Sequence, residues 1–451
     1  ANILIMGAAL MFCVAIYFGL ASCQKDSMRG ENHVAASVSQ TPASSSAPPL
    51  KGEIMGMNEH GEKWEEKYPY LSKGFTRIFG PTPIGVPPSN KKELQQLEDS
   101  EKFQKFLHEL QFPSDCDSKR IYDIDHHPYG LGSQIHVSAM SLLEAASVGM
   151  TSVLTWKTRY HAPSRCKSQL WECTFLEISS CTAADAGKKK ESQTSECKEP
   201  NTVRTAETFL RHNCSYIKRK QKRIGAFSSG WLQHRPIIRN LKKRAKIEGE
   251  YGALFYFREA VRFLLRPNEL MTNFTLSVKN QVKGLPSNQD MSQVFGAHIR
   301  HGEDKMARAQ YSAQDFAKFI YHRLEAQGSF KYVFLASNSK AAHTDLPNHL
   351  RKLSKGRGAD FEAPKVVYIP NAFFKTIGTG DSKQDPYSTL KNYDQEGGWD
   401  EMMSMVAQLF ILSNCGAFVG TFHHNMGQLA YELMSASTYR FSVQCMDMSG
   451  S

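Results

Sequence analysis

The chain has 451 residues, of which 41% are hydrophobic and 22% are charged, and 55 Lys and Arg against 44 Asp and Glu give a formal net charge of +11. This composition excludes a wholly disordered chain, a collagen-like chain and a polytopic membrane protein. The positive charge would suit nucleic acid, an anionic membrane or an anionic small molecule, so local patterns must distinguish these partners.

Residues 1–22 contain no charged side chain, and a helix of that length spans a hydrocarbon core of about 30 Å. We therefore predict a transmembrane signal anchor over 1–22. A cleaved signal peptide is the alternative, and the sequence around Cys23 also resembles a bacterial lipoprotein cleavage site. Residues 23–90, which include a run rich in Ser and Pro at 35–50, predict a flexible stalk.

Apolar residues recur at helical spacing after the stalk, so segment 91–115 is predicted to be an amphipathic helix. Two interpretations are open for this helix: it mediates oligomerisation, or it packs on the folded body of the same chain. The second is favoured, because any half-buried helix shows this spacing. The apolar positions are Leu94, Leu97, Phe103, Phe106, Leu107 and Leu110.

The cysteines indicate an oxidising compartment. They do not form the close pairs of a structural zinc site, so we expect disulfides and no metal. Asn213 and Asn273 each begin a glycosylation sequon, which points to the same compartment. With the anchor, these features predict a single-pass protein that faces the secretory lumen. The cysteines beyond Cys13 and Cys23 are Cys116, Cys166, Cys173, Cys181, Cys197, Cys214, Cys415 and Cys445.

The last third of the chain alternates between short apolar runs and helical stretches. This alternation predicts a doubly wound α/β domain with a parallel sheet over 290–451. The predicted strands are 294–299, 332–337, 365–370 and 416–422, and the predicted helices are 315–327, 400–413 and 424–436.

Polar clusters directly follow the first and last of these strands. Such sheets bind ligands outside the carboxyl ends of their strands, and a helix N-terminus attracts anions. In the first cluster Arg300 can hold a phosphate through two charge-assisted bonds and Lys305 adds a point charge; the second, 421–425, precedes a helix. The clusters predict a diphosphate site, with solvated loop charges as the alternative.

The usual phosphate-binding motifs are absent from the sequence, since it contains neither G-x-G-x-x-G nor a P-loop. A glycine-containing turn at 129–136 precedes a predicted helix at 138–149 and would cover a second side of the ligand. An ordinary loop-to-helix turn is the alternative interpretation.

Five runs occur in this order along the chain: PYGLGSQIHVSAMSLLEAA, LWECTFLEISSC, FYFREAVRFLLRPNELM, GAHIRHGEDK and SNCGAFVGTFHHNMGQLAYELM. Together they resemble the α-1,6-fucosyltransferases, a family that includes the N-glycan core fucosyltransferase and the bacterial nodulation fucosyltransferases. The similarity covers residues 116–440.

The resemblance implies a GT-B-like fold of two parts, an N-terminal α/β part over 116–289 and a Rossmann-type donor-binding part over 290–451. It also implies a Golgi enzyme of type II topology with a lumenal catalytic region. This enzyme would transfer fucose from GDP-fucose to a glycan or glycoprotein with inversion, in an α-1,6 linkage on N-glycans, without a metal or other cofactor. A Cys116–Cys181 disulfide is implied as well.

The site residues also follow from the resemblance. Arg300 would stabilise the charge that gathers on the leaving diphosphate, and Glu303 or Asp304, beside Lys305, would take the acceptor proton. The residues at the family's donor-binding positions are His298, Arg300, His301, Gly130, Gly132, Gln134, Gln408, Thr421, Phe422, His423 and His424.

Several of these positions depart from the family pattern. His301 replaces an Arg, Gln408 replaces an Asp, both serines of the last motif are His423 and His424, and an acidic pair is replaced at 338–339. The alternative function is therefore a lumenal protein that binds nucleotide or glycan without turnover. A nucleic-acid binder is disfavoured, because the basic runs at 218–223 and 239–246 lack interleaved aromatic residues.

Overall fold

The computed structural model describes much of the chain beyond residue 90, and the predicted anchor at 1–22 lies outside it. Within the described part, no helix has the length and apolar character needed to cross a membrane. The described residues are 69–72, 91–124, 130–155, 160–161, 164–192, 214–219, 235–282, 284–285, 291–299, 311–327, 330–337, 340–355, 362–369, 395–420, 425–438 and 445–447.

A small parallel sheet forms in the first part of the chain, with the strand order β2-β1-β3. Its strands are β1 (Ile121–Ile124), β2 (Thr151–Leu154) and β3 (Tyr216–Arg219). Both flanking strands pair in parallel with β1, and all four β1 residues are buried. Helix α7 (Ala183–Glu191) packs beside this sheet.

A second sheet, entirely parallel, has the order β6-β5-β4-β7-β8. Numbered along the chain, this order is 3-2-1-4-5, that of a doubly wound sheet. The predicted strands at 294–299 and 332–337 are confirmed, while those at 365–370 and 416–422 are shorter than predicted. The strands are β4 (Val294–Ile299), β5 (Tyr332–Ser337), β6 (Lys365–Val367), β7 (Ala417–Gly420) and β8 (Cys445–Asp447).

Helices cover both faces of the second sheet, and the alternating side chains of β4 contact both layers. Phe295 and Ile299 face a core shared with α13 (Ala313–Gln327) and α14 (Lys340–Lys355). Gly296 faces the opposite side, where a Cβ atom would lie 3.1 Å from Leu412 of α16 (Gln395–Ser413). Helix α17 (Asn425–Thr438) packs on α16.

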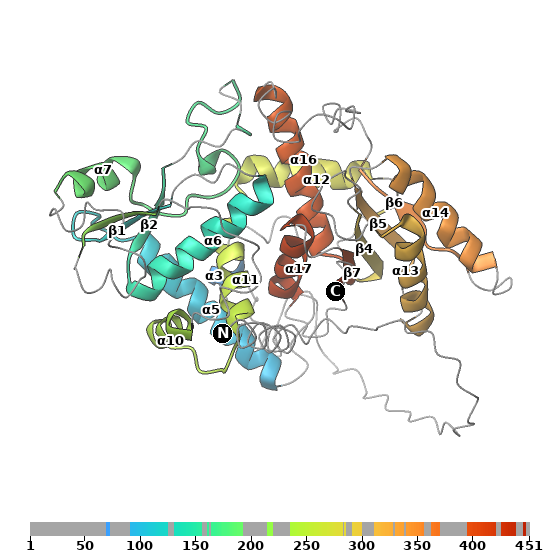
Figure 1. The fold of residues 1–451 in the computed structure, drawn as a ribbon, viewed down its shortest axis with the longest axis horizontal. Coiled ribbons are helices and arrows are strands. Elements are labelled where there is room, and N and C mark those ends of the chain that lie inside the picture. The colour runs from blue at the N-terminus through green and yellow to red at the C-terminus, as the bar shows by residue number, and fades with distance from the viewer. Residues whose placement is uncertain are drawn as a thin grey trace, which may run out of the picture.

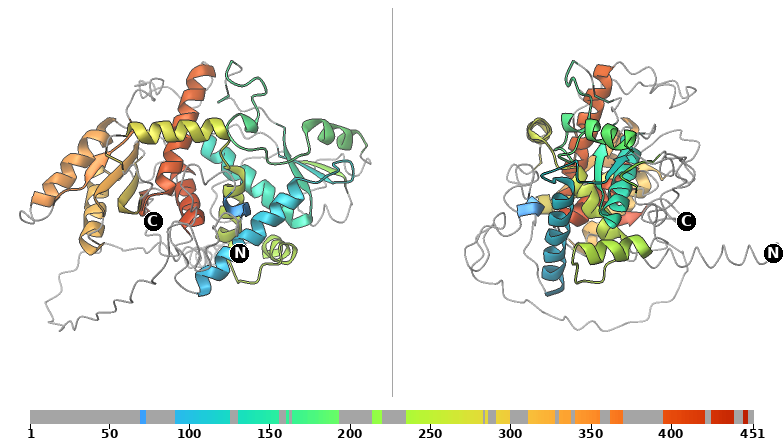
Figure 2. Two further views of the ribbon diagram at one scale, coloured as in Figure 1. Left: turned by 180° about the vertical axis from the view of Figure 1, so that it is seen from behind. Right: turned by 90° about the vertical axis from the view of Figure 1, so that its left-hand side faces the viewer.

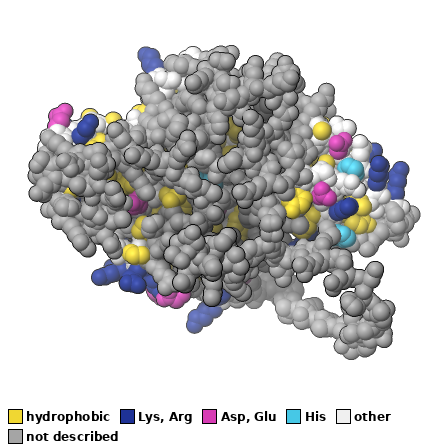
Figure 3. Space-filling view, viewed as in Figure 1, with side chains coloured by type: hydrophobic (Ala, Val, Ile, Leu, Met, Phe, Trp, Pro, Cys, Tyr) yellow, Lys and Arg dark blue, Asp and Glu magenta, His cyan; other side chains and the backbone are white. Residues whose placement is uncertain are grey.

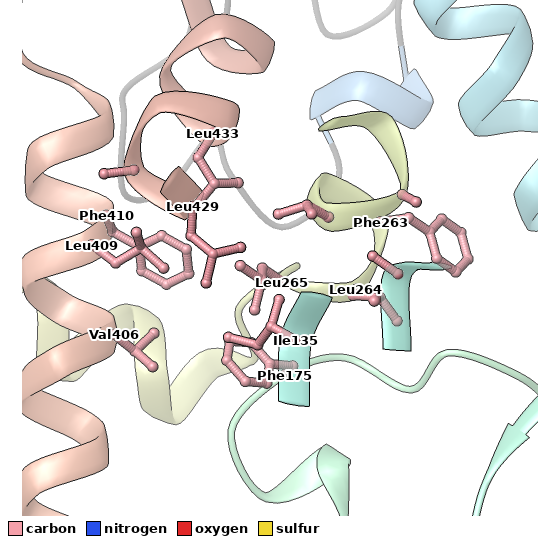
Figure 4. Packing of buried hydrophobic residues seen from close by; sticks show 14 of the residues in the cluster. Ile135, Phe175, Phe263, Leu264, Leu265, Val406, Leu409, Phe410, Leu429 and Leu433 are labelled. Carbon is pink, nitrogen blue, oxygen red and sulfur yellow. The ribbon is translucent and has the colours of Figure 1, made fainter. Parts of the chain in front are cut away.

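A layer of helices lies between the two sheets, as Figure 1 and the left view of Figure 2 show. It contains α6 (Leu131–Val148), α11 (Ala253–Leu264), α16 and α17, and α12 (Glu269–Gln281) packs against α16. One hydrophobic core joins these helices, so the two sheets share it. Its residues include Ile135, Phe175, Phe263, Leu264, Leu265, Val406, Leu409, Phe410, Leu429 and Leu433 (Figure 4).

The predicted amphipathic helix forms as α5 (Lys91–Gln111) and packs on the body, as favoured. Phe103 is fully buried against Tyr256 of α11, with ring centroids 5.4 Å apart. Gln104 Nε2 donates to Glu259 Oε2 at 2.9 Å in the same interface. A short helix inside the predicted stalk, α3 (Pro69–Ser72), packs against α5, so this part of 23–90 is ordered on the body.

The basic stretch at 239–246 contributes to packing. It lies in α10 (Arg235–Arg244) and the turn after it, where Leu241 and Ala245 are buried. Arg244 Nε donates to the Ser147 carbonyl of α6 at 3.0 Å. Arg239 and Lys243 of α10 are exposed, and Figure 3 shows Lys and Arg side chains in dark blue at the lower left, where α10 lies in Figure 1. Arg244, one of the residues behind the positive net charge, therefore stabilises the contact between α6 and α10.

His161 predicts a dependence of stability on pH. Its ring is buried, and Nε2 lies 2.9 Å from Thr174 Oγ1. Burial lowers the pKa of His161 from 6.5 to about 4, although backbone hydrogen bonds with Gln169 and Leu170 act to raise it. The pKa of His161 is lower in the folded than in the unfolded state, so protonation of the ring favours unfolding. The stability of the fold is therefore unaffected by this group above pH 6.5 and decreases as the pH falls towards 4.

The expected loss from this group between pH 7 and pH 5 is about 2 kcal/mol of unfolding free energy. Urea unfolding at the two pH values measures it. His161→Gln, whose amide can still donate to Thr174, should lose about that much of the pH dependence. An unchanged pH dependence in the variant would show that His161 does not carry it.

Candidate functional site

The candidate site lies at the carboxyl ends of β4 and β7. These strands are neighbours, and the chain order of the sheet reverses between them, which is where doubly wound sheets bind ligands. The register pairs His298 of β4 with Gly420 of β7. Segments 300–305 and 421–424 leave from these two strand ends, so the two predicted clusters start from adjacent points.

Apart from Asn425, the residues of the two clusters lie outside the described part of the chain. The structure therefore fixes only where the chain leaves β4, at Ile299, and where it enters α17, at Asn425. The predicted site residues concerned are Arg300, His301, Glu303, Asp304, Lys305, Thr421, Phe422, His423 and His424.

Two helix N-termini meet beside this edge of the sheet. Gly132, in the first turn of α6, packs against the first residue of α17: a Cβ atom at Gly132 would lie 2.8 Å from Asn425 Cβ and 3.3 Å from Met426 N. Asn425 Nδ2 donates to Ser133 Oγ at 2.6 Å. First-turn N–H groups have no partner within their helix and carry a partial positive charge, so the paired ends favour an anion.

Gln134 does not lie in a turn as predicted. Helix α6 begins at Leu131 instead of residue 138, with Gly130 as its N-cap and no side-chain capping bond. Gln134 is therefore a buried residue of the helix, and its N–H donates to the Gly130 carbonyl at 3.1 Å. The predicted start was late because glycines usually mark loops, whereas Gly132 is needed here for the contact with α17.

A buried polar pair lies directly behind the two helix ends. His136 of α6 and Glu432 of α17 are 0% and 1% exposed, and His136 Nε2 lies 3.1 Å from Glu432 Oε2. The other ring nitrogen, Nδ1, lies 2.9 Å from Asn425 Oδ1. Burial raises the pKa of the Glu432 carboxyl, and the bonds from His136 and Gln428 oppose this shift.

Gln408 lies on the helix that covers the His298 face of the second sheet. His298 is half-buried near the end of β4, on the same face as Gly296 and therefore towards α16. Gln408 of α16 is buried, and its Nε2 donates to the Ser404 carbonyl of its own helix at 3.3 Å. One amide hydrogen of Gln408 is thus used within α16.

Sequence patterns do not relate His136, Ser133, Asn425 and Glu432 as one group. Ser133 and His136 lie in the turn predicted at 129–136, Asn425 ends the predicted cluster at 421–425, and Glu432 lies in the helix predicted at 424–436. The available signal was the presence of a His and a Glu at buried positions of α6 and α17, since buried ionisable groups require partners. Which partners they find depends on the tertiary packing.

The cysteines form the disulfide that the family resemblance implies. Cys116 and Cys181 are bonded, with a Cα–Cα distance of 5.6 Å, and Cys166 is bonded to Cys173. Cys214 is also disulfide-bonded. The described residues contain no group of three or more His, Cys, Asp or Glu that could hold a metal ion.

Of the two predicted glycosylation sites, the one at Asn273 lies within the described residues. Asn273 has an exposed side chain on α12. The hydroxyl of Thr275, in the same sequon, is buried and donates to the Met271 carbonyl at 2.9 Å. Asn213 lies outside the described residues.

Comparison with known proteins gives only distant structural similarity. No protein-family model matches the sequence, and no curated protein sequence matches it. The crystal structure of fucosyltransferase NodZ from Bradyrhizobium is similar with a TM-score of 0.34 and 13% identity, over 69% of this chain and 92% of that chain. That of POFUT1 in complex with GDP-fucose has a TM-score of 0.37 and 11% identity, over 74% and 99%.

Proposed function

We propose that this chain is a glycosyltransferase that moves fucose from GDP-fucose to a glycan acceptor. The observation that carries the proposal is the strand order of the second sheet, which starts the two predicted phosphate-binding segments from adjacent strand ends. The paired N-termini of α6 and α17 beside them add positive potential. The five sequence runs that resemble the α-1,6-fucosyltransferases favour an α-1,6 linkage on N-glycans.

The proposed reaction is a single displacement with inversion. The acceptor oxygen attacks the anomeric carbon of fucose, the bond from that carbon to the diphosphate oxygen breaks, and GDP leaves with the bonding electrons. Arg300 and Lys305 would stabilise the charge on the diphosphate. Glu303 or Asp304 would accept the proton of the acceptor hydroxyl. No metal or other cofactor is needed for this step.

The proposed setting is the Golgi lumen, with the body anchored through residues 1–22. The disulfides Cys116–Cys181 and Cys166–Cys173 support an oxidising compartment. The exposed Asn273 is available as an N-glycan acceptor site in that compartment. A gel shift on enzymatic deglycosylation of the full chain, abolished by Asn273→Gln with Asn213→Gln, tests the lumenal location.

A second candidate function is binding of nucleotide or glycan without turnover. It is favoured by the departures at His301 and Gln408, since Gln408 stands at a family Asp position and donates to its own helix. Incubation of the full chain with GDP-fucose and a panel of N-glycans separates the two functions. A mass increase of one deoxyhexose is expected, and unchanged acceptors together with GDP binding would favour the second function.

Arg300→Ala tests the diphosphate assignment. Loss of a charge-assisted phosphate contact is expected to weaken GDP binding at least about tenfold, measured by calorimetric titration of the full chain. Arg239→Ala, on α10 and exposed, is the matched control and should leave the affinity unchanged. Equal affinities for wild type and Arg300→Ala would refute the role of Arg300.

A further inference from the structure

A continuous chain of polar side chains runs from the core between α6 and α17 to the N-termini of both helices. Glu432 and His136 lie at its buried end, and Asn425 and Ser133, both half-buried, lie at its other end. The geometry points to a positioning role for His136 and Glu432: they hold Asn425 against Ser133, so that two helix N-termini form one anion-binding edge. This inference rests on the proposed function, because the anion concerned is the donor diphosphate.

Donors and acceptors can be assigned along this row of polar side chains. Asn425 Nδ2 donates to Ser133 Oγ at 2.6 Å, so its Oδ1 faces His136 Nδ1 at 2.9 Å. An amide oxygen only accepts, and Nδ1 therefore carries a hydrogen. Nε2 of the same ring faces Glu432 Oε2 at 3.1 Å, and a proton lies between them. The ring is thus held from behind by Glu432 and holds Asn425 in front.

Packing alone does not require these residues. Both side chains are buried, and the His136 ring packs on Phe257 of the shared core with ring centroids 5.5 Å apart; replacing a buried charged pair by apolar residues of similar volume is often neutral or stabilising. A buried polar network fixes one arrangement of the elements that it joins. The element fixed here is the first residue of α17, which directly follows the predicted phosphate segment 421–424.

The backbones of α6 and α17 approach each other closely at their N-termini, so the contact between Asn425 and Ser133 fixes the orientation of both helix ends. Gly132 allows the start of α17 to lie against the first turn of α6, and the bond from Asn425 to Ser133 then sets the rotation of one helix end relative to the other. Preorganised backbone donors cost no rearrangement when an anion binds. Loosening Asn425 should therefore weaken donor binding more than acceptor binding.

Two substitutions of one residue separate positioning from packing. In His136→Asn the amide nitrogen lies nearest the place of Nδ1 and can still donate to Asn425, whereas in His136→Gln it lies nearest Nε2 and reaches Glu432 instead. Both variants remove one of the two contacts of the ring. A structural role predicts similar effects of both, and the positioning role does not.

The measurement is GDP affinity of the full chain by calorimetry, with KM for GDP-fucose and for the acceptor. We expect His136→Gln to weaken GDP binding and to raise KM for GDP-fucose about tenfold, and His136→Asn to stay within about threefold of wild type. Acceptor KM should change little in either. Gln104→Ala, which removes a buried contact between α5 and α11, is the control and should lower the melting temperature without changing GDP affinity.

Asn425→Ala keeps the test decisive if the His136 variants fold poorly, since it leaves the buried pair intact. It should weaken GDP binding about tenfold, and the double variant with His136→Gln should be no weaker than either single variant. Equal GDP affinity of wild type, His136→Gln and Asn425→Ala would overturn the positioning role while leaving the proposed function standing. Failure of the wild type itself to bind GDP would overturn both.

Discussion

Replacing both Cys116 and Cys181 by serine is expected to lower the free energy of unfolding by about 4 kcal/mol. The bond closes a loop with a sequence separation of 65, and opening it restores the conformational entropy of that loop to the unfolded chain. The loop contains β1, α6 and β2. Cys181 is buried in a small apolar cluster with Ile121 and Val153, so few apolar contacts hold this end of the loop in place once the disulfide is absent.

The Cys166–Cys173 disulfide is the matched control, because its sequence separation is only 7. The same loop-closure relation gives about 2 to 3 kcal/mol for its removal. Urea unfolding of the full chain and of the two double-serine variants measures the difference. Equal losses in both variants would mean that loop closure does not determine the effect. Neither change should alter GDP affinity well below the unfolding transition.

Much of the second sheet could be predicted from the sequence, because its strands are short uninterrupted apolar runs. The strand at 294–299 is an example, since both of its faces are covered by helices. Helix α14 was not predicted, and Pro347 lies inside it. Strand β8 has only three residues, which are too few to show a period.

The first sheet shows why its strands escaped prediction. Strand β1 has four residues, and one of them is Asp123. Its carboxylate accepts hydrogen bonds from Thr155 Oγ1 at 2.7 Å and from the Tyr216 hydroxyl at 2.8 Å. These partners satisfy the charge within the sheet, but they come from β3 and from the residue after β2. A polar residue in so short a run removes the apolar pattern that identifies a buried strand.

The candidate site divides in the same way. The clusters at 300–305 and 421–424 could be proposed because a general rule places ligands at strand ends. The contacts behind them could not, since His136 is separated from Asn425 by 289 residues and from Glu432 by 296. No period or local motif relates positions so far apart. Only the packing of α6 on α17 brings them together.

Gly132→Ala is expected to destabilise the fold by about 1 to 3 kcal/mol and to weaken GDP binding at least about tenfold. Helix propensity alone would predict a gain, since Ala is favoured over Gly inside a helix. The contact with α17 reverses the sign: the new Cβ would lie 2.8 Å from Asn425 Cβ and 3.3 Å from the Asn425 carbonyl carbon and Met426 N. Backbone atoms cannot rotate away, so α17 must shift and its N-terminus must leave Ser133.

Gly187→Ala is the control that isolates this contact. Gly187 also lies in a helix, α7, and nothing lies within 4 Å of its added Cβ atom. Here the same substitution should stabilise the protein by about 0.5 to 1 kcal/mol and leave GDP affinity unchanged. Urea unfolding and calorimetric titration of the two variants measure both quantities. A stabilised Gly132→Ala variant with unchanged GDP affinity would show that the α6 and α17 ends do not act together on the donor.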